Sequence, residues 1–163
     1  MAADPLSPVN RENLANLLFL AGRFDEATAE SARASEVDPS RPDGIAAFVL
    51  IFNRRFDVAL RLAQAWPEGA DRTQCLALVL HGLGRKVEAD AQLEELIAAY
   101  GADEPFRVAE VYAYRGENDE AFRWLQATSR LQPLRRPPVT HFSPFLKPLH
   151  SDARWSAWVA SLH

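Results

Sequence analysis

One short motif recurs four times along this chain at nearly constant spacing. It reads GRFDEA at 22–27, RRFDVA at 54–59, GRKVEA at 84–89 and GENDEA at 116–121. The closing alanines, Ala27, Ala59, Ala89 and Ala121, are therefore separated by 32, 30 and 32 residues. Self-similarity at a period of roughly 20–50 residues is typical of repeat proteins, in which each unit buries its apolar face against the next. The chain is therefore expected to be a short array of similar units.

Helix-forming sequence flanks each copy of the motif on both sides. Around the first copy, RENLANLLFLA precedes at 11–21 and ATAESARASEV follows at 27–37. Glycine opens three of the four copies, at Gly22, Gly84 and Gly116. Glycine after a helix provides the left-handed backbone that ends it, and the closing alanine suits a close crossing of two helices. We predict a helix, a tight turn and a helix, repeated four times, in an all-α fold of about nine helices without a sheet.

The acidic residues of the motif are predicted to be structural. Asp25 and Glu26, like Asp119 and Glu120, fall in the first turn of a following helix. Carboxylates are favourable there because the first N–H groups lack helical partners and the helix dipole is positive. We therefore interpret these residues as helix-capping groups rather than as catalytic acids.

The motif and its flanks resemble the tetratricopeptide repeat (TPR), a helical hairpin of about 34 residues. The match is strongest over residues 13–39, where the signature positions are Leu14, Ala15, Leu18, Gly22, Phe24, Ala27, Ala34 and Pro39. The later copies depart from the pattern at Arg54 and Lys86, and Pro67 shortens one helix. The resemblance implies an all-α, right-handed superhelical array of about four TPR hairpins followed by a C-terminal capping helix. The hairpins are expected at 8–40, 41–70, 71–101 and 102–133.

The two ends of the chain are predicted to differ from the repeats. Residues 1–7 are interpreted as the remnant of a preceding repeat or as a linker. Residues 134–150 are rich in proline and are expected to form an ordered, non-helical strap. In residues 151–163 a helix, capped by Ser151 or Asp152, is expected to cover the end of the array. Its apolar stripe consists of Trp155, Trp158, Val159 and Leu162.

The C-terminal third carries a second, more specific resemblance. AEVYAYRGENDEAFRWLQ at 109–126 and SPFLKPLHSDARWSAW at 143–158 resemble the last part of TPR regions in bacterial signalling proteins. Those regions follow a class III adenylate or guanylate cyclase domain or a winged-helix DNA-binding domain. Ala153 and Trp155 depart from the usual pattern, whereas the matching residues include Tyr112, Gly116, Ala121, Phe122, Trp124, Leu125, Pro144, Leu149, Asp152 and Arg154. The resemblance implies a regulatory module of a larger bacterial protein.

The TPR resemblance also implies a concave face lined by the first helix of each hairpin, which we take as the candidate binding groove. Its apolar middle suits an amphipathic helix or an extended peptide. Alternatively, its aromatic residues pack between repeats or under the proline-rich strap, and Phe48 and Phe52 distinguish these two cases. Ala113 is expected on the open face. The candidate groove residues are Asn13, Asn16, Phe19, Leu20, Ile45, Phe48, Ile51, Phe52, Gln74, Cys75, Leu78, His81, Phe106, Arg107, Glu110 and Tyr114.

No group of residues predicts catalysis, a cofactor or a metal. The four histidines lack the spacing of metal ligands. The single cysteine, Cys75, has no neighbours in sequence that would make it a nucleophile, and HGLGRK at 81–86 lacks the pattern of a phosphate loop. We therefore predict a protein that is not an enzyme and that uses no cofactor. The carboxylate-clamping class of TPR proteins is also excluded, because its positions are Glu12, Asn16, Ile45, Asp71 and Cys75 here.

Net charge and hydropathy limit the classes of binding partner that this chain is expected to have. The chain carries 18 Lys and Arg against 22 Asp and Glu, a net charge of −4, so neither nucleic acid nor a membrane is expected as a partner. Without a signal peptide or an apolar run of spanning length, a cytoplasmic location is expected. The leading hypothesis is a scaffold that binds a protein or peptide. The alternative is a small-molecule sensor that regulates an attached cyclase or DNA-binding domain.

Overall fold

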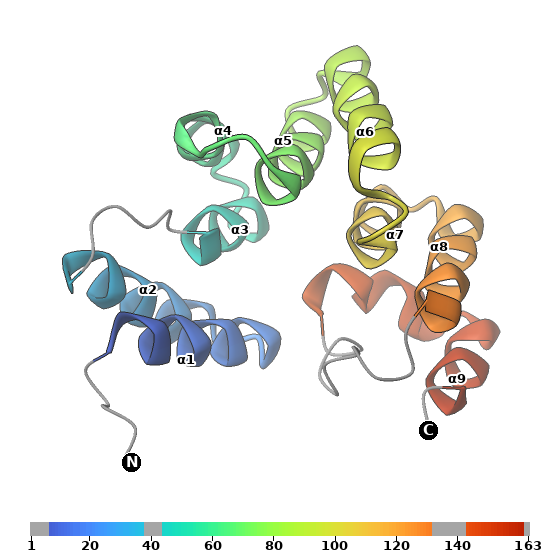
Figure 1. The fold of residues 1–163 in the computed structure, drawn as a ribbon, viewed down its shortest axis with the longest axis horizontal. Helices are drawn as coiled ribbons and strands as arrows, with labels where there is room; N and C mark the ends of the chain where they lie inside the picture. The colour runs from blue at the N-terminus through green and yellow to red at the C-terminus, as the bar shows by residue number, and fades with distance from the viewer. Residues whose placement is uncertain (1–6, 38–43, 132–142, 162–163) are drawn as a thin grey trace. The chain divides into compact units, whose positions relative to one another are not determined.

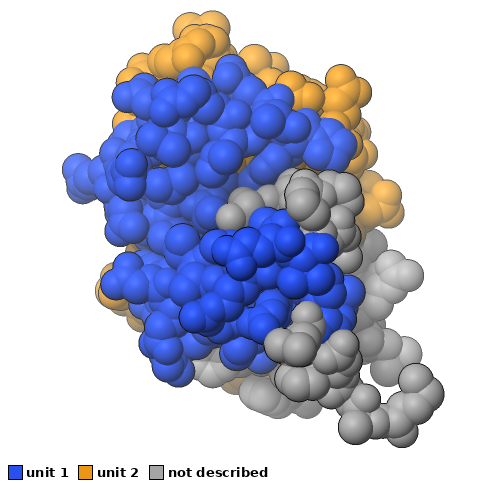
Figure 2. All heavy atoms as spheres, turned by 90° about the vertical axis from the view of Figure 1, so that its left-hand side faces the viewer, with its two compact units in different colours: residues 1–67 blue, residues 68–163 orange. Residues whose placement is uncertain are grey.

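The computed structural model describes residues 7–37, 44–131 and 143–161. Within these ranges the protein consists of nine α helices and one 3-10 helix, without a strand (Figure 1). The predicted all-α fold is confirmed. The chain divides into two compact units, unit 1 at residues 1–67 and unit 2 at residues 68–163 (Figure 2).

Unit 1 consists of two helical hairpins. Helix α1 (Pro8–Leu20) pairs with α2 (Phe24–Val37), and α3 (Gly44–Phe52) pairs with α4 (Phe56–Ala65). Helix α3 also packs against α2 and α1, so the second hairpin stacks on the first. The buried core contains both small and large apolar side chains, among them Ala15, Phe19, Ala27, Ala47, Ile51, Ala59 and Trp66.

Unit 2 begins with two further hairpins of the same kind. Helix α5 (Ala70–Gly82) pairs with α6 (Lys86–Tyr100), and α7 (Pro105–Tyr114) pairs with α8 (Asn118–Leu131). Helix α7 packs against both α5 and α6, so these hairpins also stack.

A short C-terminal cap covers the last hairpin of unit 2. The 3-10 helix η2 (Pro144–Ser151) packs on α7, and α9 (Ala153–Ala160) contacts η2 and α8. Asp152 caps α9 by accepting a hydrogen bond from the Arg154 N–H at 3.0 Å. The cap and the hairpin share one core cluster, formed by Ala109, Ala113, Ala121, Phe122, Leu125, Leu146, Leu149 and Trp158.

The cap corrects two predictions from the sequence. The expectation of a non-helical strap is wrong for residues 144–150, which lie in η2, because Pro144 stands at the start of η2, where a backbone N–H has no helical partner. The expectation that Ala113 lies on an open face is also wrong. Its side chain is 0% exposed and belongs to the same cluster as Leu146 and Leu149 of η2. Residues 134–142 and Leu162 lie outside the described residues.

The four copies of the motif form the same helix-ending turn. One residue in each turn has a left-handed backbone, with φ of 73° at Gly22, 56° at Arg54, 72° at Gly84 and 77° at Gly116. The next N–H donates to the carbonyl five residues earlier at 2.8–2.9 Å, as in a Schellman motif. Arg54 therefore forms the turn that glycine forms elsewhere, and its departure from the pattern leaves the hairpin intact.

The alanine that closes each motif lies at the contact between the two helices of its hairpin. Ala27, Ala59, Ala89 and Ala121 are all 0% exposed. A larger side chain would overlap the facing helix, because protein interiors are close-packed. This packing explains why alanine recurs at that position.

The acids of the motif lie in the first turn of their helices, as predicted, but the two glutamates are engaged differently. Glu26 accepts hydrogen bonds from the Arg23 guanidinium at 2.7 and 2.5 Å. Glu120 accepts one from Arg123 at 2.9 Å. These carboxylates therefore form ion pairs with nearby arginines in addition to lying in the first turn, where the sequence predicted them.

Candidate functional site

The candidate residues of unit 1 differ widely in exposure. Asn13 and Asn16 of α1 are exposed. Phe19 and Ile51 are only 4% and 1% exposed, so they belong to the core of unit 1. The other four are half-buried, namely Leu20, Ile45, Phe48 and Phe52. Six of the eight candidates of unit 1 thus contribute surface.

Five aromatic side chains of unit 1 form one connected group, the unit 1 aromatic cluster: Phe19, Phe24, Phe48, Phe52 and Trp66. The Phe19 ring centroid lies 5.6–6.1 Å from the rings of Phe24, Phe48 and Phe52. Phe24 stacks on Phe52 at 5.2 Å, and Trp66 meets Phe48 edge-on at 6.3 Å. Aromatic pairs attract each other at such distances. Phe48 and Phe52 therefore have a packing role in unit 1 while part of each side chain remains exposed.

Sequence reasoning missed two members of this cluster. Phe24 was assigned only to the repeated turn, and Trp66 was not considered. Phe24 is the first residue of α2, and Trp66 directly follows the last residue of α4. At these positions a side chain can contact the first helix of the same hairpin. Aromatic residues beside the predicted helix ends are the signal that could have found them.

The candidate residues of unit 2 also divide between core and surface. Gln74, Cys75 and Leu78 are 1%, 0% and 0% exposed. The remaining five are half-buried: His81, Phe106, Arg107, Glu110 and Tyr114. The surface part of this set therefore comes from the end of α5 and from α7.

Three of these candidates form a polar network with Ser143. Gln74 Nε2 donates to Glu110 Oε2 at 2.7 Å, and Arg107 Nη1 donates to Gln74 Oε1 at 2.8 Å. Ser143 Oγ donates to the other carboxylate oxygen of Glu110 at 2.5 Å. Both oxygens of Glu110 thus have partners, and the network connects α5, α7 and the start of the cap.

Burial and charge act in opposite directions within this network. Burial raises the pKa of Glu110, while hydrogen bonds from Ser143 and Gln74 and the charge of Arg107 act against that rise. Burial alone would lower the pKa of Arg107, but neighbouring carboxylates, above all Asp71 at 2.7 Å, raise it overall. The polar groups satisfy one another, so we assign the network a positioning role.

The C-terminal cap occupies part of the groove predicted for unit 2. Besides the bond from Ser143 to Glu110, the Phe145 ring meets Tyr114 edge-on at 5.9 Å. Tyr114 in turn lies 5.9 Å from the His81 ring. Phe145 is only 2% exposed, so this contact is part of the core. The cap therefore covers one side of α7 from residue 143 onward.

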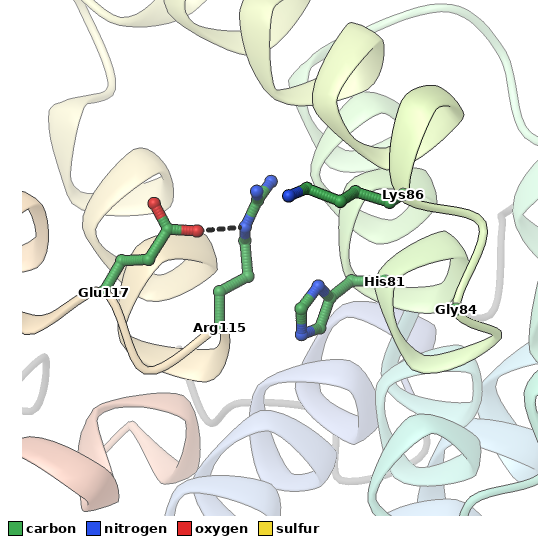
Figure 3. Close-up of a pocket in the computed structure, with 5 residues that line it drawn as sticks. All are labelled: His81, Gly84, Lys86, Arg115 and Glu117. Atoms are coloured by element: carbon green, nitrogen blue, oxygen red, sulfur yellow. Dashed lines mark hydrogen bonds and ion pairs between the residues drawn. The ribbon is translucent and has the colours of Figure 1, made fainter.

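A pocket of about 280 Å³ lies beside the turns of the two hairpins of unit 2 (Figure 3). It is lined by His81, Gly84, Lys86, Arg115 and Glu117. Only His81 belongs to the residues predicted for the groove. Gly84, Lys86 and Glu117 come from the repeated motifs, which the sequence indicated to be purely structural, and Arg115 directly precedes the fourth motif.

Arg115 is the most buried charged group of this pocket, with only 8% of its side chain exposed. Its Nη2 donates to Asp90 Oδ1 at 2.5 Å, and its Nε donates to Glu117 Oε1 at 2.6 Å. Burial and the positive charge of Arg115 lower the pKa of His81, against the opposing effects of Glu117 and Asp90. The pocket thus contains a guanidinium fixed by two carboxylates next to a histidine that favours its neutral form.

Cys75, which was considered as a nucleophile, is a buried thiol. Burial, with a smaller contribution from the charge of Asp71, raises its pKa to about 12. A thiol with such a pKa is protonated at neutral pH and reacts poorly. Among the described residues, no group of three His, Cys, Asp or Glu side chains is arranged to hold a metal ion. None of the described helices has both the length and the apolarity needed to cross a membrane.

Helical hairpins that stack on one another, each with the same Schellman turn between its two helices, make this fold a TPR-like helical repeat. A solved structure with this fold is that of YrrB, described as "a TPR protein with an unusual peptide-binding site". The two superpose with a TM-score of 0.51 at 19% sequence identity, over 98% of this chain and 86% of YrrB. No protein-family model and no curated protein matches the sequence.

Proposed function

We propose that this chain is a non-catalytic scaffold that binds a peptide, or a helix of a partner protein, on the exposed faces of α1 and α3 in unit 1, with α7 of unit 2 as a separate candidate surface. The unit 1 aromatic cluster carries the proposal, because Phe24, Phe48 and Phe52 pack together and yet remain partly exposed. Aromatic side chains held rigidly at a surface are typical anchors of protein interfaces. YrrB, which shares the fold, is described as having a peptide-binding site.

Polar residues next to the aromatic cluster fit the same proposal. Asn13 and Asn16 are exposed on α1, and an amide side chain both donates to and accepts from a peptide backbone. In unit 2, the half-buried Phe106 and Tyr114 on α7 provide a second aromatic surface. An amphipathic helix or an extended peptide is the partner chemistry that such mixed surfaces suit.

We further propose that the chain is the regulatory C-terminal part of a bacterial protein of the cyclase or winged-helix type. Support comes from the resemblance of 109–126 and 143–158 and from the contacts of Arg154 in that region. Arg154 lies 4.4 Å from the centre of the Phe122 ring and donates to Asp119 at 2.7 Å. These contacts fit a cap at the end of an array. The coding sequence upstream of this chain in its gene tests the proposed domain context. A domain there that is neither a cyclase nor a winged-helix domain would contradict the proposal.

A peptide screen with matched variants tests the scaffold. A displayed peptide library is selected against the whole chain, and the affinity of the best binders is measured for wild type, Asn16→Arg and Ala32→Arg. Asn16 and Ala32 are both exposed, on α1 and α2 respectively, so each variant adds the same charge to a helix surface. We expect Asn16→Arg to weaken binding by about ten-fold or more, because a larger, charged side chain on the contact face displaces the peptide; ten-fold corresponds to about 1.4 kcal/mol. Equal affinity of the two variants would contradict the proposed face.

The alternative function, a small-molecule sensor, is favoured by one observation, the pocket of about 280 Å³. A ligand that binds only the folded state stabilises it in proportion to its concentration. A thermal-shift screen against metabolites would therefore separate the two functions. A melting temperature raised by several degrees by one compound favours the sensor, whereas stabilisation by selected peptides alone favours the scaffold.

A further inference from the structure

The pocket between the turns of unit 2 contains a cationic group with an unused hydrogen-bond donor. Arg115 Nε and Nη2 bind Glu117 and Asp90, but Nη1 is buried and has no hydrogen-bond partner. Leaving a charged donor unpaired costs free energy, so a buried donor of this kind is uncommon in proteins. Arg115 Nη1 can therefore donate a hydrogen bond to an acceptor that enters the pocket.

The surroundings of Arg115 favour an anionic partner. The Lys86 side chain points toward the Arg115 guanidinium from the opposite wall of the pocket, and the His81 ring lies next to both (Figure 3). Two positive groups that face one another repel unless an anion lies between them. Lys86 is exposed and begins α6, whose first N–H groups carry a positive partial charge.

We propose that this pocket binds the oxyanion group of a small molecule, a carboxylate or a phosphate, between Lys86 and Arg115. The Lys86 amine moves aside, one oxygen of the anion accepts from Arg115 Nη1, and the amine binds another oxygen. Glu117 and Asp90 hold the guanidinium in place through its other two nitrogens. The pocket, at about 280 Å³, is much larger than the ~30 Å³ of one water, so it admits an organic group attached to the anion.

The charges around the pocket sum to about zero, so the proposed binding of an anion rests on the placement of its donors rather than on net charge. Lys86 and Arg115 balance Asp90 and Glu117, and His81 adds a positive charge only when protonated. A bound anion next to His81 would favour the protonated ring, so its pKa, which burial and Arg115 lower in the free protein, rises on binding. His81 is therefore a reporter of occupancy. The pocket shares no residue with the unit 1 aromatic cluster, because its lining residues all belong to unit 2. His81 also belongs to the groove predicted for unit 2, next to Tyr114, so the two proposals are tested separately, with inorganic anions here and with peptides there.

The test uses nuclear magnetic resonance of the His81 ring in the whole chain. Sodium phosphate and sodium acetate are titrated separately at neutral pH, with sodium chloride adjusted to hold the ionic strength constant. The sequence contains two lysines, Lys86 and Lys147. Because both are exposed, Lys86→Gln and Lys147→Gln form a matched pair that keeps the fold and removes one charge.

We expect a saturable shift of the His81 signals with phosphate, acetate or both, and a higher His81 pKa at saturation. Saturation by phosphate alone assigns the site to phosphorylated compounds, and saturation by acetate alone assigns it to carboxylates. Lys86→Gln should weaken binding by about ten-fold, the loss typical of one charge-assisted hydrogen bond, while Lys147→Gln leaves it unchanged. Shifts that do not saturate, or equal effects of the two lysine variants, would overturn the proposal.

Discussion

At the scale of single residues, the repeated turn depends on backbone conformation more than on side-chain contacts. Gly22, Gly84 and Gly116 have a left-handed backbone, and a Cβ added to any of them would meet nothing within 4 Å. Arg54 holds the same conformation with a side chain. The preference for glycine in the motif therefore reflects the strain that L residues bear there.

Gly116→Ala should lower the free energy of unfolding by about 1–2 kcal/mol, because only backbone strain is added. Arg54→Gly removes that strain, which stabilises the folded state, but it also raises the entropy of the unfolded chain, which opposes this gain. The free energy of unfolding should therefore be unchanged or higher by up to about 1 kcal/mol. Urea denaturation of both variants measures these changes. A destabilising Arg54→Gly would show that the Arg54 side chain, rather than its backbone, stabilises the second turn.

His81 should make the stability of unit 2 depend on pH. Its pKa in the folded protein lies below the value of about 6.5 expected in the unfolded chain. Protonation therefore favours unfolding, and stability is highest above pH ~6.5 and falls as the pH decreases toward the folded pKa. As the pH is lowered from about 6.5 toward the folded pKa, the free energy of unfolding of wild type should fall more than that of His81→Gln. Parallel pH profiles of the two proteins would contradict the lowered pKa.

Phe48→Asp should destabilise the protein, because the ring packs against Phe19 and Trp66. We expect a loss of about 1–3 kcal/mol, which is less than for a fully buried phenylalanine because Phe48 is half-buried. At about 2–8 °C per kcal/mol, differential scanning fluorimetry would detect this loss as a lower melting temperature. Exposed Asn13→Asp is the control and should have little effect. An unchanged melting temperature for Phe48→Asp would mean that the ring has no packing role.

At the scale of helices and hairpins, the sequence predicted the pairs well and their surroundings poorly. The motif spacing located all four turns. The glycine positions depend only on the local backbone conformation, and the alanine positions depend only on a contact within one hairpin. The burial of Ile51 and Leu78 was not foreseen, since it depends on contacts with neighbouring helices, whereas the burial of Phe19 agrees with the alternative of packing between repeats. Ala113 was misplaced for the same reason, because the segment that covers it lies more than thirty residues further along the chain.

Ala113→Leu and Ala121→Leu should both destabilise unit 2. Both alanines are 0% exposed in one core cluster, and adding methylenes to a close-packed site costs about 1–3 kcal/mol. Gln126→Leu on α8 is the control, because Gln126 is exposed and the added apolar group meets solvent. Chemical denaturation should separate the two alanine variants from the control. A neutral Ala113→Leu would mean that η2 does not stay packed on α7.

At the scale of the whole molecule, the sequence allowed the fold to be predicted but not the site. A TPR-like repeat is confirmed by the hairpins and by the similarity to YrrB. The candidate surface was taken from the resemblance, which assumes that every first helix has an open side. In unit 2 that side of α7 is partly covered by the cap, and the pocket lies at the turns instead. Such features arise from contacts that the repeat pattern does not encode.

The most direct test of the scaffold function is to map a bound peptide by nuclear magnetic resonance. A peptide selected against the whole chain is titrated into the labelled protein, and the perturbed backbone amides are assigned. We expect the largest perturbations in unit 1, on α1 and α3 around Asn16 and Phe48. A peptide that binds the separate surface of unit 2 should instead perturb the amides around Phe106 on α7. Perturbations confined to α4, α6 and α8, or to the part of α2 beyond Phe24, would contradict the proposed binding surface.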